Sequence, residues 1–433
     1  MNGRWEPVRS ALDSAAMARA YALAAFGTFF AGHAIEAMAG SVTLITIAAG
    51  LVAVGIAILV VRRAEISLLR LVPLSVLLFI TWAGITLVLP MSGPTRSFSH
   101  WLALVGVAVI AVVIAHVRDT LQTVRALGDV LRTLLTGSLL VEILSGVLLD
   151  MPFPFLGVQG AIAAGGPIQG LFGTRNMLGF VAVIALITFV IELRTHSISR
   201  GLGIYSLVLA GGLAALSSSP TVIVLSLAVA VASAALAIVR HTPAERRPRV
   251  QWILGALVVI GIGTAYVLRH QVIALLDAGT DFSTRAELWN SILVQVRSHA
   301  YQAWGWVGPW NPDDPLAFPY TAINLFGRHH ASALSAYFDV LLQLGWLGLV
   351  LFALLAGTAL VRSWLVASER RSVLYAWTPL VLVTLLVDSV FESFTLFGVG
   401  WLMLALCAMR AGQSRSWREA AAARAPETPG TAR

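Results

Sequence analysis

The residues best suited to chemistry lie in one polar stretch, residues 270–335, of a chain that is otherwise strongly apolar. Arginine, histidine and tryptophan gather there, at Arg285, Arg297, Arg328, His329, His330, Trp289, Trp304, Trp306 and Trp310. A guanidinium can bind a phosphate through two parallel hydrogen bonds, and an imidazole can take up a proton near neutral pH. We therefore expect any chemistry to take place in this stretch or directly beneath it.

A second polar stretch, Gly170-Leu-Phe-Gly-Thr-Arg-Asn-Met-Leu-Gly179, leads into a predicted helix and places Arg175 at its start. A helix dipole favours an anion at that position, so an arginine there needs a reason. Together with the unpaired N–H groups of the helix start, Arg175 would suit a phosphate. The alternative is an arginine that reaches the phosphates of lipid headgroups.

The tryptophans also have two interpretations. Trp304-Gly305-Trp306 could stack on sugar rings, whereas tryptophans near a membrane face commonly anchor the chain at the interface, as we expect for Trp310. Two adjacent histidines with Asp313 and Asp314 nearby do not have the spacing of a recognised metal site. We therefore expect neither a metal nor another cofactor.

The composition is that of a membrane protein. Only 12% of the 433 residues are charged, against about 25% in soluble domains. The basic residues are all arginines, scattered among short loops without a basic stripe, which argues against nucleic acid as a partner. A single cysteine, Cys407, excludes an intramolecular disulfide. Membrane lipids are thus the first expected partner.

Hydropathy predicts an all-α, polytopic integral membrane protein with about twelve transmembrane helices. One transmembrane domain would cover residues 1–415 and include a large loop, 270–335, between helices nine and ten. Residues 416–433 would form a partly disordered tail. The expected spans are 20–38, 42–61, 71–90, 99–116, 130–149, 174–192, 202–217, 221–239, 251–269, 336–361, 374–390 and 393–410.

The distribution of arginine predicts the orientation. The N-terminal tail, every second short loop and the C-terminal tail carry most of the arginines. Such loops face the cytoplasm, so both termini are expected inside the cell (cytoplasmic) membrane and the 270–335 loop outside it.

Acidic residues within predicted spans are costly and often functional. They are Glu36, Glu142, Asp339 and Asp388, and for each a buried structural partner is as plausible as a role in chemistry. Asp388 and Glu392 fall at the outer end of the eleventh predicted span, where solvation is the simpler explanation.

Several short motifs resemble the O-antigen ligase family and the related polymerases of lipid-linked glycans. The matching segments, in order along the chain, are Gly170-x-Phe-Gly-x-x-Asn-x-Leu-Gly179, Ser217-Ser-Ser-Pro-Thr221, Arg285-x-x-Leu-Trp289, Gly305-Trp-x-Gly308, Ala333-Leu-Ser-Ala-Tyr-Phe-Asp339 and Gln343-Leu-Gly-Trp-Leu-Gly348. Their order and their expected position outside the membrane make the set moderately specific.

The resemblance implies a metal-independent, inverting glycosyl transfer. The donor would be a glycan on a polyprenyl diphosphate, and the acceptor a hydroxyl of a second glycan or glycolipid. Arginines of this family hold the diphosphate and a histidine takes the acceptor proton. The candidate residues here are Arg175, Arg285 and Arg328 for the diphosphate, His330 as the base with Arg285 as its catalytic partner, and Trp289, Trp304 and Trp306 for the glycan.

Two departures from the family pattern matter. The usual His-Asn pair falls on Leu334-Ser335, and the usual arginine is missing between Ser217 and Thr221. His330 lies four residues before Leu334, one turn if the segment is helical, and could reach the same place. Arg175 could likewise replace the missing arginine.

The alternative, from a different class, is a twelve-helix transporter or flippase of a lipid-linked or envelope substrate. Such carriers usually show two related halves with a site at the midplane. This chain shows no related halves and has its polar residues in one large loop, which favours the enzyme.

Overall fold

Long apolar segments fold as helices because a helix satisfies its own backbone hydrogen bonds. The computed structural model describes residues 6–63, 71–88, 94–268, 271, 279–298, 304–310, 324–325 and 328–413. Its first helices are α1 (Glu6–Asp13), α2 (Ala15–Phe30), α3 (Gly32–Ala39), α4 (Ser41–Val61), α5 (Leu74–Thr86), α6 (Pro94–Val117) and α7 (Thr120–Ile143). The later ones are α8 (Arg175–Arg194), α9 (Arg200–Leu216), α10 (Pro220–His241), α11 (Arg247–Val267), α13 (Gly279–Ser298), α14 (Ala336–Glu369), α15 (Trp377–Phe391) and α16 (Gly398–Gln413).

Seven helices of the described residues are long and apolar enough to cross a membrane: α4, α6, α7, α8, α10, α14 and α15 with its preceding turn. An eighth span results if α2 and α3, which meet at a bend of 71°, are taken together. Each of the twelve predicted apolar segments lies on a helix, but those on α5, α9, α11 and α16 are not among these helices, so twelve spans are not confirmed. A 13-residue helix such as α5 is only about 20 Å long, against a hydrocarbon core of about 30 Å.

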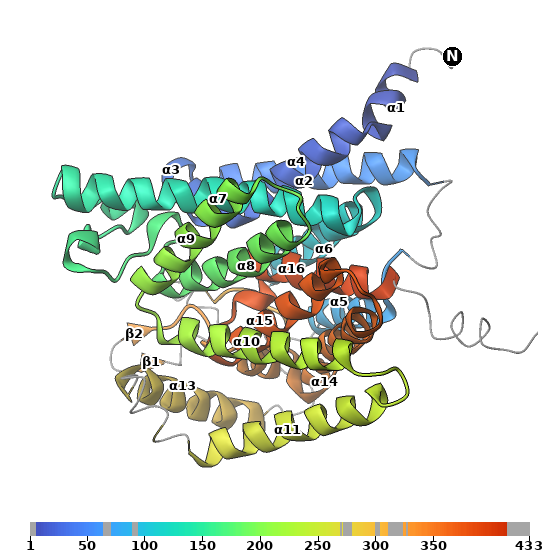
Figure 1. Cartoon of the computed structure of the whole chain (residues 1–433). Coiled ribbons are helices and arrows are strands. Elements are labelled where there is room, and N and C mark those ends of the chain that lie inside the picture. Colours follow the sequence, from blue (N-terminus) through green and yellow to red (C-terminus); the bar gives the residue numbers. More distant parts are fainter. Residues whose placement is uncertain are drawn as a thin grey trace, which may run out of the picture.

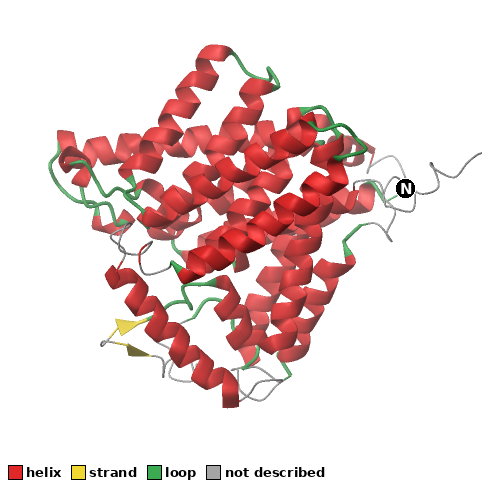
Figure 2. Ribbon diagram, turned by 60° about the horizontal axis from the view of Figure 1, so that its bottom comes forward, coloured by secondary structure: helices red, strands yellow, loops and turns green. Residues whose placement is uncertain are grey.

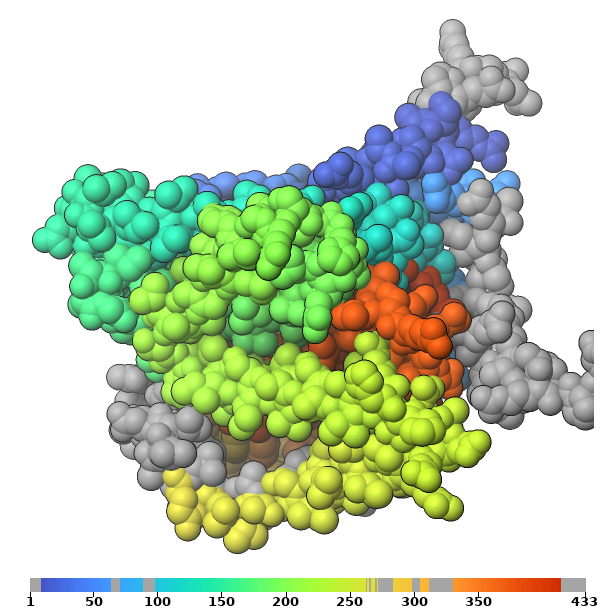
Figure 3. Space-filling model, viewed as in Figure 1, coloured from blue at the N-terminus to red at the C-terminus, as the bar shows by residue number. Residues whose placement is uncertain are grey.

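α8 forms the centre of the bundle. Residues 178–185 are buried without a break, as expected of a helix surrounded by other helices. α7 and α9 lie on one side of it, and α10 and α15 lie on the other (Figure 1). α10 and α11 run as two bands across the lower part of the face seen in Figure 3, and α11 exposes large apolar side chains such as Trp252, Val259 and Tyr266. That exposure suits contact with lipid.

The predicted 270–335 loop contains regular structure. α13 presents Leu288, Ile292 and Val296, spaced by four residues, to a small apolar cluster that includes Leu341 and Leu342 of α14. Two antiparallel strands of two residues each, β1 (Asn324–Leu325) and β2 (Arg328–His329), lie beside α13 at the edge of the molecule (Figure 2). The expected tail 416–433 and Asp313 and Asp314 lie outside the described residues.

α14 is broken near its start. Gly345 has φ 66° and ψ −169°, which frees carbonyl groups of the preceding turn. The carbonyls of Leu342 and Gln343 accept hydrogen bonds from the backbone N–H groups of Trp304 (3.2 Å) and Gly305 (3.0 Å). The side chain of Gln343 also accepts from Val307 N–H (2.9 Å) and Gly308 N–H (3.0 Å). The Gly305-Trp-x-Gly308 motif thus fixes the broken helix in place.

Candidate functional site

Arg285, on α13, forms the centre of a polar cluster at one end of the bundle. Its Nη1 donates to the backbone carbonyls of Leu334 (2.9 Å) and Phe391, and its Nη2 donates to Oε1 of Glu392 at 3.0 Å. The Arg285 and Glu392 side chains are 12% and 8% exposed. The acidic partner of Arg285 is the residue after α15, 107 positions along the chain.

Two further helices join the cluster through Glu392. Asn176 Nδ2 donates to Oε1 of Glu392 (2.7 Å), and Ser219 Oγ donates to Oδ1 of Asn176 (2.7 Å). Thr174 caps α8 and so places Asn176 in its first turn, and Ser219 is the residue before α10. The starts of α8 and α10 and the end of α15 thus meet α13 in one connected network.

Asp388 lies one helical turn before Glu392 on the same face of α15. It is fully buried, and neither of its carboxylate oxygens has a hydrogen-bond partner among the described residues. It interacts electrostatically with both Glu392 and Arg285. The predicted solvation of Asp388 and Glu392 was wrong for both, because α13 brings Arg285 over this end of α15.

Asp339 holds the turn that presents Leu334 to Arg285. Its Oδ2 accepts from Ala333 N–H (3.1 Å) and Ser393 Oγ (2.5 Å), and its Oδ1 accepts from the indole of Trp310 (2.7 Å). Leu334 has φ 50°, a left-handed conformation that a non-glycine residue adopts only when its surroundings impose it. Of the two roles considered for Asp339, these contacts support the structural one.

Glu142 also has a structural role. Its Oε1 accepts from the backbone N–H groups of Gln169 (3.0 Å) and Gly170 (2.8 Å), and Ser138 Oγ accepts from Leu171 N–H (3.1 Å). These bonds fix the loop that precedes α8. Gly170, with φ 54°, packs so closely on Ser138 that a side chain would collide with it. The glycine-rich motif therefore positions the start of α8.

The other predicted cations are less centrally placed. Arg175 is the first residue of α8, directly before Asn176. Arg328 lies in β2, and its side chain is outside the described set. His330 follows β2 and is partly buried, but residues 330–335 are not helical and α14 begins at Ala336. His330 therefore does not lie one helical turn from Leu334, and that prediction was wrong.

Three tryptophans were expected to face a glycan. Trp304 and Trp306 are only 3% and 1% exposed, so protein surrounds both rings. The ring of Trp289 stacks on Phe338, with centroids 4.8 Å apart and planes at 7°. Its indole N–H donates to the carbonyl of Ala333 at 2.9 Å. In this conformation the tryptophans hold the turn before α14 and the 304–310 segment to the bundle.

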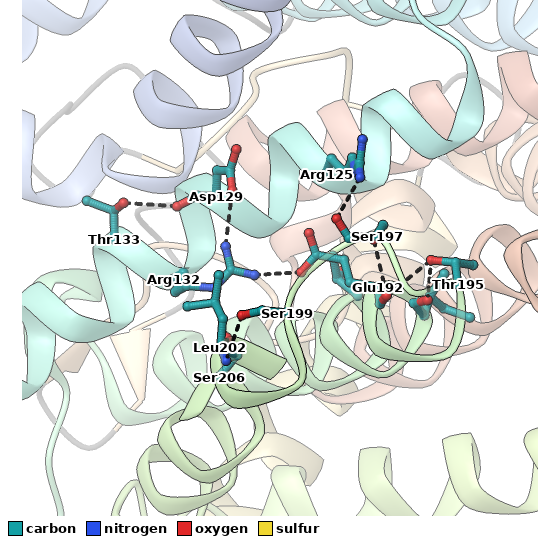
Figure 4. Close-up of polar contacts among 12 residues, drawn as sticks. Arg125, Asp129, Arg132, Thr133, Glu192, Thr195, Ser197, Ser199, Leu202 and Ser206 are labelled. Atoms are coloured by element: carbon teal, nitrogen blue, oxygen red, sulfur yellow. Dashed lines mark hydrogen bonds and ion pairs between the residues drawn. The ribbon is translucent and has the colours of Figure 1, made fainter. Parts of the chain in front are cut away.

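A second buried polar cluster lies toward the other end of α8 and was not singled out in the sequence (Figure 4). Arg132 of α7 donates to Glu192 Oε2 (2.6 Å), to Asp129 Oδ1 (3.1 Å) and to Ser206 Oγ (2.8 Å). Gly128 leaves room for Glu192, since a Cβ there would lie 2.5 Å from its carboxylate. The available signal was Arg132 inside the predicted span 130–149 and Glu192 at the end of the predicted span 174–192. The contacts join α7, α8 and α9.

Within the described ranges, no three His, Cys, Asp or Glu side chains come close enough to hold a metal ion. The Arg285 cluster instead contains one guanidinium, two carboxylates, an amide and a hydroxyl, a set able to bind sugar hydroxyls and to move a proton. Neither a scan against protein-family models nor a search of curated proteins found a match to this chain.

Proposed function

We propose that this protein is a membrane glycosyltransferase, similar to O-antigen ligases, which moves a glycan from a polyprenyl diphosphate to a hydroxyl of a glycan or glycolipid acceptor. The transfer takes place at the extracytoplasmic face of the cytoplasmic membrane. In this proposal the chain crosses the membrane about twelve times, both termini are cytoplasmic, and neither a metal nor a cofactor takes part.

The observation that carries the proposal is the meeting of motifs that lie far apart in the sequence. Asn176, Ser219, Arg285 and Leu334 belong to four of the segments that resemble the family, and a continuous chain of hydrogen bonds joins them through Glu392. Polar groups gathered in one buried place are typical of a functional site.

The opposite side of the bundle supports the proposed orientation. Arginines of α10, α7 and α16 bond there to backbone carbonyls of other segments: Arg240 to Ala367 (2.7 Å), Arg125 to Ser197 (2.6 Å) and Arg410 to Arg118 (2.7 Å). An arginine-rich end is typical of the cytoplasmic side. The Arg285 cluster then lies on the extracytoplasmic side, where a lipid-linked donor and a second glycan can meet.

Arg285 also has N–H groups with which it can bind the diphosphate of the lipid-linked glycan. It uses three of the five N–H donors of a guanidinium within the described residues. The remaining two are available for a diphosphate oxygen. Arg175, beside Asn176, and Arg328 in β2 are the further cations proposed for the diphosphate. The sequence puts His330 forward as a base only in place of the histidine missing at Leu334.

The second candidate function, transport of the same lipid-linked substrate, finds some support in the broken helix α14, because discontinuous helices are frequent in transporters. In transporters the freed carbonyls coordinate ions. Here the carbonyls of Leu342, Gln343 and Leu344 bond to Trp304, Gly305 and Trp82 of the protein itself. The break therefore favours an anchoring role over an ion site.

Deletion of the gene tests the proposal. We expect the deletion strain to lack one cell-envelope glycan and to accumulate its polyprenyl diphosphate-linked precursor, and a plasmid copy to restore the glycan. An unchanged glycan profile together with an unchanged level of lipid-linked precursors would contradict it.

A further inference from the structure

The Arg285 cluster has more hydrogen-bond acceptors than donors. One guanidinium serves two carboxylates, because Arg285 bonds to Glu392 and interacts electrostatically with Asp388, and its Nη1 is already given to two backbone carbonyls. Glu392 Oε1 accepts hydrogen bonds from both Arg285 and Asn176. Asp388 receives no hydrogen bond from the described residues on either oxygen. The cluster as it stands is suited to a ligand that donates hydrogen bonds.

Asp388 is placed where such a ligand would interact with the rest of the cluster. It precedes Glu392 by one turn, about 6 Å along the helix axis, and shares its face of α15. A buried polar group without a hydrogen bond is costly, so proteins rarely keep one without a use. Every other buried acidic side chain discussed above, namely Glu142, Glu192, Asp339 and Glu392, has at least one hydrogen-bond donor.

We propose, on the basis of the proposed function, that Asp388 is the catalytic base, which binds the acceptor hydroxyl and removes its proton. The hydroxyl proton passes to a carboxylate oxygen of Asp388. The acceptor oxygen forms a bond to the anomeric carbon of the donor as the bond from that carbon to the diphosphate breaks. The polyprenyl diphosphate leaves with the electron pair. A carboxylate thereby takes the role of the histidine that the family has where this chain has Leu334.

The hydrogen bonds distinguish Asp388 from the other candidates. Glu392 is engaged by Arg285 and Asn176, so its role is to orient both side chains. His330 lies in the irregular segment between β2 and α14. Asp388 has no exposed surface, so the acceptor reaches it only when the cluster opens on binding.

The test uses membranes of the deletion strain, which supply the accumulated donor and the acceptor, with purified protein added in detergent. Asp388→Asn removes the basic oxygen at nearly constant volume. We expect turnover to fall by a factor of ~10²–10⁴, the usual share of general base catalysis, with little change in the KM for the donor. Glu192→Gln changes a buried carboxylate of the second polar cluster, keeps an acceptor for Arg132, and is expected to lower turnover less than tenfold.

The outcomes separate this inference from the proposed function. No transfer by the wild-type protein would contradict the proposed function itself. Wild-type transfer with near-normal turnover in Asp388→Asn, or equal losses in Asp388→Asn and Glu192→Gln, would overturn the role of Asp388 alone. If Asp388→Asn does not accumulate, Asp388→Glu and Asp388→Gln replace it. Activity in Asp388→Glu and none in Asp388→Gln supports a carboxylate base, and equal activity in the two overturns it.

Discussion

Arg285 and Glu392 form an ion pair of 3.0 Å that joins α13 to the end of α15. The pair is nearly buried, and Asn176 of α8 shares the same carboxylate oxygen at 2.7 Å. α13 is therefore fixed to the bundle through a polar contact as well as through its apolar face. Any change at this pair acts on three helices at once.

The first prediction concerns the shape of the Arg285 side chain. A lysine keeps the charge, but its single nitrogen cannot span the carbonyls of Leu334 and Phe391 and the Glu392 carboxylate as a guanidinium does. We expect Arg285→Lys to lose most glycan transfer and Arg285→Ala to be nearly inactive in the complementation assay. Arg297→Lys, at an exposed position on the same helix, is the control and should behave as wild type. Near-normal transfer by Arg285→Lys would show that Arg285 does not act in the site.

The second prediction concerns Asp339 and stability. Asp339→Ala leaves the Trp310 indole, the Ala333 N–H and the Ser393 hydroxyl without their acceptor. Each buried donor that loses its partner costs about 1–3 kcal/mol. We expect a clearly lower melting temperature in detergent, whereas Glu287→Gln, exposed on α13, should leave it unchanged. Equal melting temperatures for the two variants would show that the Asp339 contacts do not stabilise the turn.

The third prediction concerns the buried pair of Arg132 and Glu192. Arg132→Met leaves the Glu192 carboxylate buried without its cation, which costs about 3–5 kcal/mol in comparable pairs. The double variant Arg132→Met with Glu192→Leu removes both charges and should recover much of the lost stability. Thermal unfolding of the single and double variants measures the difference. A double variant less stable than the single variant would mean that the pair is not the source of the effect.

The fourth prediction concerns orientation. In a Cys407→Ala background, Asn290→Cys on α13 should react with a membrane-impermeant thiol reagent in intact cells. Glu245→Cys, between α10 and α11, should react only after the membrane is permeabilised. Both positions are exposed, so reactivity reports on the side of the membrane. The reverse pattern would place α13 in the cytoplasm and contradict an extracytoplasmic site.

The sequence predicts the helices well because apolar segments of this length have few other ways to satisfy their backbone. It does not predict the contacts of Asp388 and Glu392, since their neighbours come from α13 and α8, more than one hundred residues away. Arg285 was found from its motif, but its partner was not, because the bonded groups among the described residues lie far along the chain. The spacing of Leu288, Ile292 and Val296 did carry the signal that part of the predicted loop is a helix packed on the bundle.

The most direct test of the proposed function is a reconstituted reaction. Purified protein in liposomes would receive the polyprenyl diphosphate-linked glycan that accumulates in the deletion strain, labelled in both the sugar and the lipid, together with an acceptor fraction. We predict that one polyprenyl diphosphate is released for each glycan joined to the acceptor, and that Arg285→Ala releases none. Movement of the intact donor across the liposome membrane, with no release of polyprenyl diphosphate, would contradict glycosyl transfer and establish the transporter alternative.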